Sequence, residues 1–217
     1  MISAIVLAAG LSTRMGVQKL LQPIDGEPML GRTLKALRRP SIDETVVVLG
    51  AEASRVREGI KFERERVIVN GSFEEGMSSS LRLGLKSVNP RTDAAIIALG
   101  DQPFVSPEVI DRVVGGYLAK KPPIVVPVYG GVRGNPVLFA RSVFPDVLKV
   151  RGDFGAKSVV QAYGDRVLEV PVDDEGVLFD IDTPADYERA VALSRTARRR
   201  TGREGSSQRP GPRRRSG

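Results

Sequence analysis

The 217-residue sequence contains no cysteine and no histidine. Without these side chains the protein can form no disulfide, no thiolate or imidazole metal site, no thiol nucleophile and no Ser-His-Asp triad. Any bound metal must therefore rest on oxygen ligands, which favours Mg²⁺.

The sequence also lacks a hydrophobic run of the length that a membrane span needs, about 18 residues or more. Its first residues, MISAIVLAAG, have no basic segment before the apolar one, as a secretory signal would. We therefore expect a cytoplasmic protein with no membrane contact.

Excess positive charge is confined to the C-terminus, although the whole chain has a formal charge of +7. Residues 195–217 contain nine Arg and one Glu, and the other 24 basic and 25 acidic residues nearly cancel. This tail has almost nothing apolar to bury, so we expect it to be disordered. It is either a solvated extension or a weak contact for RNA or another anionic partner. One folded domain is expected over residues 1–194.

Short runs rich in β-branched residues recur along this domain and predict strands. They cover residues 2–8, 44–50, 66–70, 93–100, 123–128, 135–140 and 166–172. Helical spacing separates the first four runs, at residues 29–39, 52–60 and 78–88, and a closing helix is expected at 183–193. This alternation predicts an α/β fold with three layers and a Rossmann-like, mostly parallel sheet. After residue 120 the pattern is richer in strands and indicates an α+β insertion or a lid.

The loop after the first predicted strand, LAAGLSTRMGVQK at residues 7–19, combines small residues with two cations. Ala8, Ala9 and Gly10 would let a ligand approach the backbone, whose N–H groups can cradle phosphate oxygens. Arg14 and Lys19 would supply charge for a polyphosphate. The spacing matches neither a P-loop nor G-x-G-x-x-G, so phosphate binding and a generic loop with solvated charges both stay open.

A second loop, IIALGDQPFVSP at residues 96–107, places Asp101 at the carboxyl end of an apolar strand. A carboxylate is costly to bury there unless it is paired or binds a cation, and Mg²⁺ on a phosphate would serve. Alternatively, Asp101 organises the turn before Pro103 or caps a helix that begins near Pro107.

A third segment, FDIDTPADYE at residues 179–188, holds two carboxylates separated by one residue. On a strand, Asp180 and Asp182 would share a face, and one of them could be a second metal ligand. Thr183 is expected to cap the following helix, with Asp186 in its first turn. Capping accounts for Thr183 and Asp186, but it does not account for both of the other carboxylates.

Taken together, these motifs resemble the nucleotidyltransferases that carry an L-x-[AG]-G-x-S-x-R-M-G-x-x-K loop, and most closely the molybdenum cofactor cytidylyltransferase family. The resemblance also includes EEGMSSSLRLGL, LGDQPFVSP, RGNPVLFA, RGDFGAK and DIDTPADYE, in this order along the domain. The Arg-rich tail lies outside it.

The resemblance implies a nucleotide-diphospho-sugar transferase type of fold. It also implies a reaction that joins CMP from CTP to the phosphate of molybdenum-bearing molybdopterin and releases pyrophosphate. The resemblance also assigns residues to the nucleotide. The backbone of Ala8, Ala9 and Gly10 would contact it, Arg14 and Lys19 would bind its triphosphate, and Ser80 would lie near the cytosine. Asp101 would hold Mg²⁺ with Asp182 as its companion, and the acceptor side would be lined by Gly134, Asn135, Asp153 and Gly155.

Two sequence differences favour CTP over GTP within this group. The first loop reads LAAG and Asp101 follows Gly100, whereas the guanylyltransferase relatives tend to have LAGG and a Cys-Asp pair. The alternatives are a guanylyltransferase, an enzyme for another phosphorylated acceptor, and a non-catalytic protein that delivers cofactor to a molybdenum hydroxylase. A redox enzyme is disfavoured because G-x-G-x-x-G and a histidine acid are missing.

Overall fold

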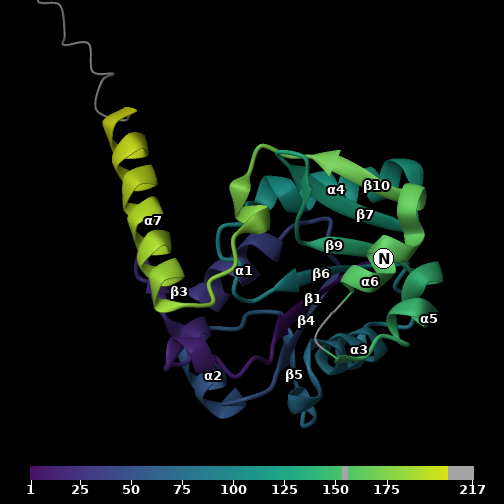
Figure 1. Cartoon of the computed structure of the whole chain (residues 1–217), viewed down its shortest axis with the longest axis horizontal. Coiled ribbons are helices and arrows are strands. Elements are labelled where there is room, and N and C mark those ends of the chain that lie inside the picture. The colour runs from purple at the N-terminus through teal and green to yellow at the C-terminus, as the bar shows by residue number, and fades with distance from the viewer. Residues whose placement is uncertain (153–155, 205–217) are drawn as a thin grey trace, which may run out of the picture.

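A mixed β-sheet with helices on both faces forms the body of the protein (Figure 1). The computed structural model describes residues 1–152 and 156–204. The strands are β1 (Ile2–Ala8), β2 (Pro23–Ile24), β3 (Glu27–Pro28), β4 (Glu44–Leu49), β5 (Arg66–Val69), β6 (Ala94–Leu99), β7 (Ile124–Tyr129), β8 (Val132–Arg133), β9 (Val137–Ala140) and β10 (Val167–Pro171). The α-helices are α1 (Met29–Leu37), α2 (Ala53–Gly59), α3 (Met77–Ser87), α4 (Pro107–Lys120), α5 (Phe144–Val147), α6 (Lys157–Tyr163) and α7 (Pro184–Glu204).

The most apolar strands occupy the middle of the sheet, whose order is β10-β7-β9-β6-β1-β4-β5, with β8 paired to β7. Strand β1 is parallel to both of its neighbours, β4 and β6, and β4 is parallel to β5. Most residues of β1, β4 and β6 are buried, as their sequences predict. Strand β5 has a neighbour on one side only, and its residues are half-buried or exposed. The predicted α/β fold with a mostly parallel sheet is confirmed.

The strand-rich region after residue 120 extends this sheet, so the expectation of an insertion or a lid is wrong. Strand β9 lies antiparallel between β6 and β7, and β10 lies parallel to β7 at the edge. Because β7 continues through the short strand β8 into β9, the chain turns back directly and needs no crossover helix.

Two apolar layers separate the sheet from its helices. Ala4 and Val6 of β1 pack with residues of α1, α2 and α4, whereas Ile5 packs with residues of α3, α5 and α6. This alternation follows from the two-residue period of a strand. Helix α3 lies close to the sheet at Gly84, where a Cβ atom would stand 2.5 Å from Ile5 Cγ2. The three-layer arrangement is therefore confirmed.

Helix α7 begins beside the β2–β3 hairpin and runs outward from the body (Figure 1). Tyr187 Oη donates a hydrogen bond to Pro23 O at 2.7 Å and fixes the first turns. The helix continues to Glu204 and so includes residues 195–204 of the tail. The expectation that the tail is disordered stays a prediction. Ala and Arg are strong helix formers and favour this continuation. The same expectation for residues 205–217 lies outside the described residues. Among the helices of the described part, none has the length and apolar character that a membrane span requires.

Candidate active site

The carboxyl ends of β1 and β6 lie side by side in the middle of the sheet. Strand β1 pairs with β4 on one side and with β6 on the other, and the chain reaches β6 only after completing β5. Open α/β sheets bind ligands in the crevice that such a switch in strand order leaves. The loops that follow β1 and β6, singled out in the sequence, therefore meet at the position where a ligand site is expected.

Small residues keep the backbone after β1 close to its neighbours. Ala8 and Ala9 are buried, whereas Gly10 is exposed. A Cβ atom at Gly50, just after β4, would stand 2.6 Å from Ala9 O. Glycine at position 50 therefore lets the Ala9 backbone lie against the end of β4. The predicted contact of residues 8–10 with a nucleotide stays a prediction.

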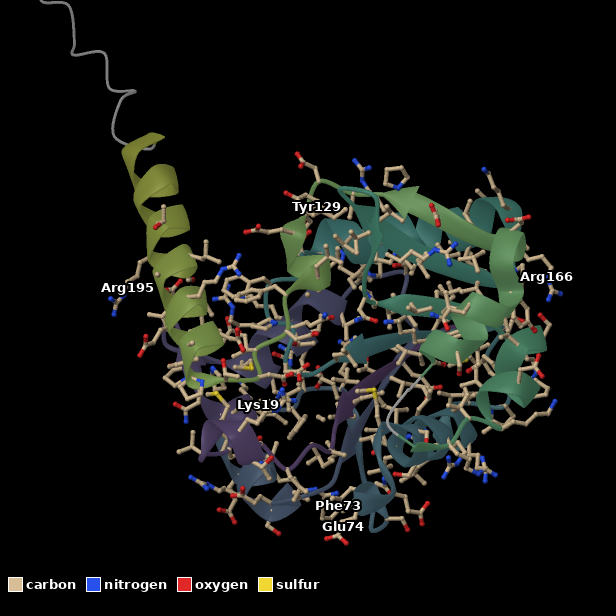
Figure 2. The ribbon with its side chains drawn as sticks, viewed as in Figure 1. Lys19, Phe73, Glu74, Tyr129, Arg166 and Arg195 are labelled. Carbon is tan, nitrogen blue, oxygen red and sulfur yellow. The ribbon has the colours of Figure 1, made fainter. Side chains whose placement is uncertain are left out.

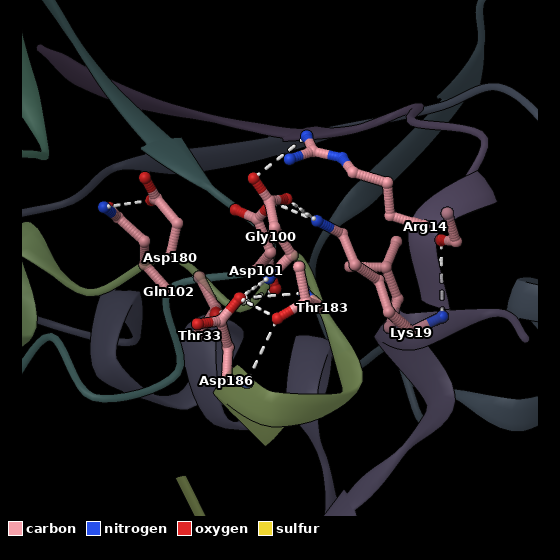
Figure 3. Close-up of polar contacts among 12 residues, drawn as sticks. Arg14, Lys19, Thr33, Gly100, Asp101, Gln102, Asp180, Thr183 and Asp186 are labelled. Carbon is pink, nitrogen blue, oxygen red and sulfur yellow. Dashed lines mark hydrogen bonds and ion pairs between the residues drawn. The ribbon is translucent and has the colours of Figure 1, made fainter. Parts of the chain in front are cut away.

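Lys19, labelled among the side chains of the whole molecule in Figure 2, is the centre of a cluster that joins three loops (Figure 3). Its Nζ atom donates to Asp101 Oδ2 at 2.6 Å and to Asp182 Oδ1 at 2.7 Å, and its side chain is 11% exposed. Desolvation opposes the charge of Lys19, but attraction to Asp101 and hydrogen bonds to both carboxylates outweigh it and raise its pKa. The structure thus brings together residues predicted separately from the first, second and third motifs.

Arg14 reaches the same cluster from its solvent side. Its Nη2 atom lies 3.1 Å from Asp182 Oδ2, and its side chain is 69% exposed. Desolvation alone would raise the pKa of Asp182, but the hydrogen bond from Lys19 and the charges of Lys19 and Arg14 outweigh it and lower that pKa. Two cations and two carboxylates of the predicted set therefore form one ionic network.

Asp180 has a different partner from Asp182. The Gln102 side chain donates from Nε2 to Asp180 Oδ1 at 2.6 Å. Partial desolvation and the nearby charge of Asp101 raise the pKa of Asp180, although the hydrogen bond from Gln102 opposes this. The segment around both aspartates is irregular, not the strand that was considered. Sequence reasoning missed Gln102, which its place directly after Asp101 could have suggested.

The start of α7 holds Asp182 in place. Thr183 Oγ1 accepts from Asp186 N at 3.2 Å, and Asp186 Oδ2 accepts from Thr183 N at 2.8 Å, which makes a reciprocal helix cap. Asp186 Oδ2 also accepts from Asp182 N at 3.2 Å. The predicted capping roles of Thr183 and Asp186 are confirmed, and the cap also fixes the backbone of Asp182.

We expect Asp186→Ala to lower the free energy of unfolding by about 1 kcal/mol near neutral pH, the usual loss for a removed helix cap. The hydrogen bonds from Thr183 lower the pKa of Asp186. The stabilisation by its carboxylate is therefore present above the unfolded-state pKa of about 3.9 and is lost as the pH falls through the lowered value. Urea unfolding of the wild type and the variant from pH 7 to pH 3 tests this. The difference should shrink in acid, while Glu188→Ala, exposed on the same helix, should differ little from the wild type.

The turn that carries Lys19 is held by side chains of its own loop. Ser12 Oγ accepts from Lys19 N at 3.3 Å and donates to Gln18 Oε1 at 3.2 Å. Gln18 is 1% exposed, and the same oxygen accepts from Leu20 N at 3.4 Å. These bonds fix the backbone of Lys19 and leave its long side chain to reach the carboxylates. The role of Gln18 was not found from the sequence.

The predicted base-side residue, Ser80, lies in a second polar group on α3. Asn70, the residue after β5, donates from Nδ2 to Ser80 Oγ at 2.9 Å and to Ser79 Oγ at 2.8 Å. Ser80 is 3% exposed and Asn70 is 5% exposed. The sequence did not identify Asn70, although its place at the carboxyl end of a strand is a usable signal. The proposed approach of Ser80 to a base stays a prediction.

The residues predicted for the acceptor side contact a different segment from the ionic network. Gly134 N donates to Pro127 O at 2.9 Å, and Asn135 N donates to Val177 O at 2.9 Å. A Cβ atom at Gly134 would stand 2.5 Å from Val177 O, which gives this glycine a packing role. Asp153 and Gly155 lie outside the described residues, so their predicted roles stay predictions.

The mostly parallel sheet, together with cationic and acidic loops that meet at its switch point, defines a nucleotidyltransferase of the nucleotide-diphospho-sugar transferase fold. The chain belongs to the MobA-like NTP transferase domain family, which matches residues 4–167. This confirms the family to which the sequence motifs pointed.

Several named proteins are similar to most of the chain. Purine catabolism protein PucB of Bacillus subtilis is 32% identical over 195 residues, which cover 85% of this chain and 93% of PucB. The molybdenum cofactor cytidylyltransferase of Escherichia coli is 23% identical, over 86% of this chain and 93% of that protein. Nicotine blue oxidoreductase of Paenarthrobacter nicotinovorans is 27% identical, over 84% of this chain and 92% of that protein.

Solved structures agree with the fold. Rv0371c of Mycobacterium tuberculosis superposes with a TM-score of 0.80 at 34% identity, over 88% of this chain and 97% of that one. The same protein has also been solved in complex with manganese. A nucleotidyl transferase of Methanothermobacter superposes with a TM-score of 0.78 at 27% identity, over 91% of this chain and 99% of that one.

Proposed function

We propose that this protein transfers the CMP moiety of CTP to the phosphate of molybdenum-bearing molybdopterin, releasing pyrophosphate and forming molybdopterin cytosine dinucleotide. The observation that carries the proposal is the meeting of Arg14, Lys19, Asp101 and Asp182 at the switch point of the sheet. The two cations would bind the triphosphate, and the two carboxylates would hold the metal that accompanies it.

The residues present fit a hard divalent cation such as Mg²⁺. Asp101 and Asp182 offer carboxylate oxygens that converge on one cationic atom, Lys19 Nζ. Within the described residues, no group of three or more acidic side chains is arranged to hold a metal. One or two carboxylates suffice for Mg²⁺, because it commonly takes its other ligands from water and substrate phosphates. Bound there, the ion would neutralise charge on the phosphates.

The chain's own residues need only to position and neutralise the reactants. An oxygen of the acceptor phosphate attacks the α-phosphorus of CTP, forming the new P–O bond as the bond to pyrophosphate breaks. A phosphate monoester is largely ionised near neutral pH, so no general base is required, which suits a protein without histidine. Lys19 and Arg14 would stabilise the departing pyrophosphate, and correct placement of the two phosphates supplies much of the rate.

The choice of substrates rests on the sequence motifs and the relatives. The LAAG loop, the Gly100–Asp101 pair and the similarity to a molybdenum cofactor cytidylyltransferase support CTP and molybdopterin. Ser80, with Asn70 behind it, would face the cytosine, and Gly134, Asn135 and the segment around Asp153 would line the acceptor side. The product would then pass to a molybdenum hydroxylase.

Thermal melting with CTP, GTP, ATP and NADH, each with Mg²⁺ and with a chelator, tests this proposal. A ligand at 100 times its dissociation constant stabilises the folded state by about 2.7 kcal/mol, so we expect CTP with Mg²⁺ to raise Tm by several degrees. An assay of pyrophosphate release from CTP with molybdopterin follows. A preference for GTP would identify a guanylyltransferase. Use of CTP with a different acceptor would contradict the proposal that molybdopterin is the acceptor. No response to any triphosphate would favour a cofactor-delivery protein.

A further inference from the structure

Lys19 occupies the point at which the two carboxylates converge. Its ammonium lies 2.6 Å from Asp101 Oδ2 and 2.7 Å from Asp182 Oδ1, in a side chain that is only 11% exposed. Asp180 is close enough for the charges of Asp101 and Asp182 to raise its pKa. Two carboxylates therefore hold this ammonium, with a third nearby, and it is the least exposed cation of the network.

A divalent cation and this ammonium compete for the same carboxylate oxygens. Both need direct contact with the oxygens, and two cations at contact distance repel each other strongly in a partly desolvated site. Two of the three N–H donors of Lys19 Nζ are taken by the carboxylates, so a triphosphate that binds Nζ through more than one oxygen, as the proposed function requires, draws it away from at least one of its present partners. Metal binding and movement of Lys19 are therefore linked.

We propose that Lys19 acts as a resident cation of the metal site: it holds Asp101 and Asp182 together in the nucleotide-free protein and exchanges its place with a divalent cation when a triphosphate draws it away. This inference rests on the proposed function, because it takes a nucleoside triphosphate as the ligand that moves Lys19. It adds an order of events: the site has a low affinity for metal until the triphosphate binds.

The local structure suits such an exchange. The backbone of Lys19 is fixed by the bond from its N–H to Ser12 Oγ, so only the flexible side chain has to move. Arg14 lies on the solvent side of Asp182, with 69% of its side chain exposed, and would be the first cation that an incoming phosphate meets. The phosphates would then offer Lys19 new anionic oxygens in place of the carboxylates that it leaves.

The test measures Mn²⁺ binding to the nucleotide-free protein from the electron paramagnetic resonance signal of the free ion. We expect Lys19→Gln, which removes the charge and keeps a polar but shorter side chain, to bind Mn²⁺ about tenfold or more tightly than the wild type. The double variant Lys19→Gln/Asp101→Asn should lose this gain, because it lacks one of the two carboxylates. Lys35→Gln, at a lysine whose side chain is 70% exposed, should match the wild type.

If Lys19→Gln is poorly stable without metal, melting curves answer the same question, because Mn²⁺ should raise its Tm more than that of the wild type. Equal Mn²⁺ affinity of Lys19→Gln and the wild type, with equal Tm shifts, would overturn the inference. The exchange itself is followed by NMR of the wild type labelled with ¹⁵N-lysine. The side-chain signal of Lys19 is assigned as the one missing from Lys19→Gln, and it should shift when CTP is added with a chelator.

The outcomes separate the two proposals. An unmoved Lys19 signal in protein that binds CTP by melting contradicts the exchange and leaves the proposed function standing. A gain in Mn²⁺ affinity in Lys19→Gln, in a protein that binds no triphosphate, contradicts the proposed function and leaves Lys19 as the resident cation of a metal site.

Discussion

Asp101→Asn is expected to lower the turnover number by about 10²–10³, the range seen when one group that stabilises transition-state charge is removed. Asparagine keeps the volume of the side chain and one oxygen, but it lacks the negative charge that a divalent cation requires. Asp101 is well placed for this role because β6 ends directly before Gly100 and the carboxylate already contacts a cation at 2.6 Å. Helix α4 begins only at Pro107, with Ser106 before it, so capping does not explain Asp101.

Steady-state rates of pyrophosphate release over a range of Mg²⁺ concentrations provide the measurement. The variant should stay folded, with Tm within a few degrees of the wild type, because the amide oxygen can still accept from Lys19 Nζ. The control is Asp111→Asn. Asp111 lies on α4 and forms a surface ion pair with Arg39, so this variant should keep normal turnover. Turnover of Asp101→Asn close to that of the wild type would show that this carboxylate holds no catalytic metal.

The central strands could be predicted from the sequence because burial on both faces leaves a local mark. The runs that form β1, β4 and β6 are nearly continuous in apolar residues, and the helices between them keep a regular spacing. The place of β9 could not be predicted in this way. Its antiparallel position between β6 and β7 depends on pairing with strands distant in sequence, and the pattern within β9 contains no signal of its partners.

The charged part of the site was also predictable, for a topological reason. Parallel strands bring their carboxyl ends to one edge of the sheet, so a cationic loop after β1 and an aspartate after β6 must lie near each other. Coordinates were needed to see that Asp182, and not Asp180, contacts Lys19, because both lie in an irregular segment where the two-residue period of a strand does not apply. Gln102 and Asn70 were missed because neutral amides give no charge pattern, and their roles come from hydrogen bonds to Asp180 and Ser80.

Lys19→Ala is expected to weaken CTP binding by about 10–100-fold when metal is chelated, since a charge-assisted contact contributes about 1.5–3 kcal/mol. Affinity for CMP should change little, because the Lys19 side chain is assigned to the pyrophosphate part of the nucleotide. Arg14→Ala should show a smaller loss for CTP. Its side chain is 69% exposed, and solvent screens the interactions of exposed charges. Isothermal titration of the wild type and each variant with CTP and with CMP gives, for each nucleotide, the ratio of the variant's dissociation constant to that of the wild type.

The comparison between the two nucleotides separates a ligand contact from a structural role. Removing Lys19 also leaves Asp101 and Asp182 without the cation between them, so the variant should melt below the wild type. A purely structural loss of this kind distorts the site for every ligand. CTP and CMP affinities would then fall by the same factor, whereas a contact with the β- and γ-phosphates lowers the affinity for CTP alone. Equal losses would assign Lys19 to the scaffold of the site and would remove the triphosphate contact on which the proposed reaction depends.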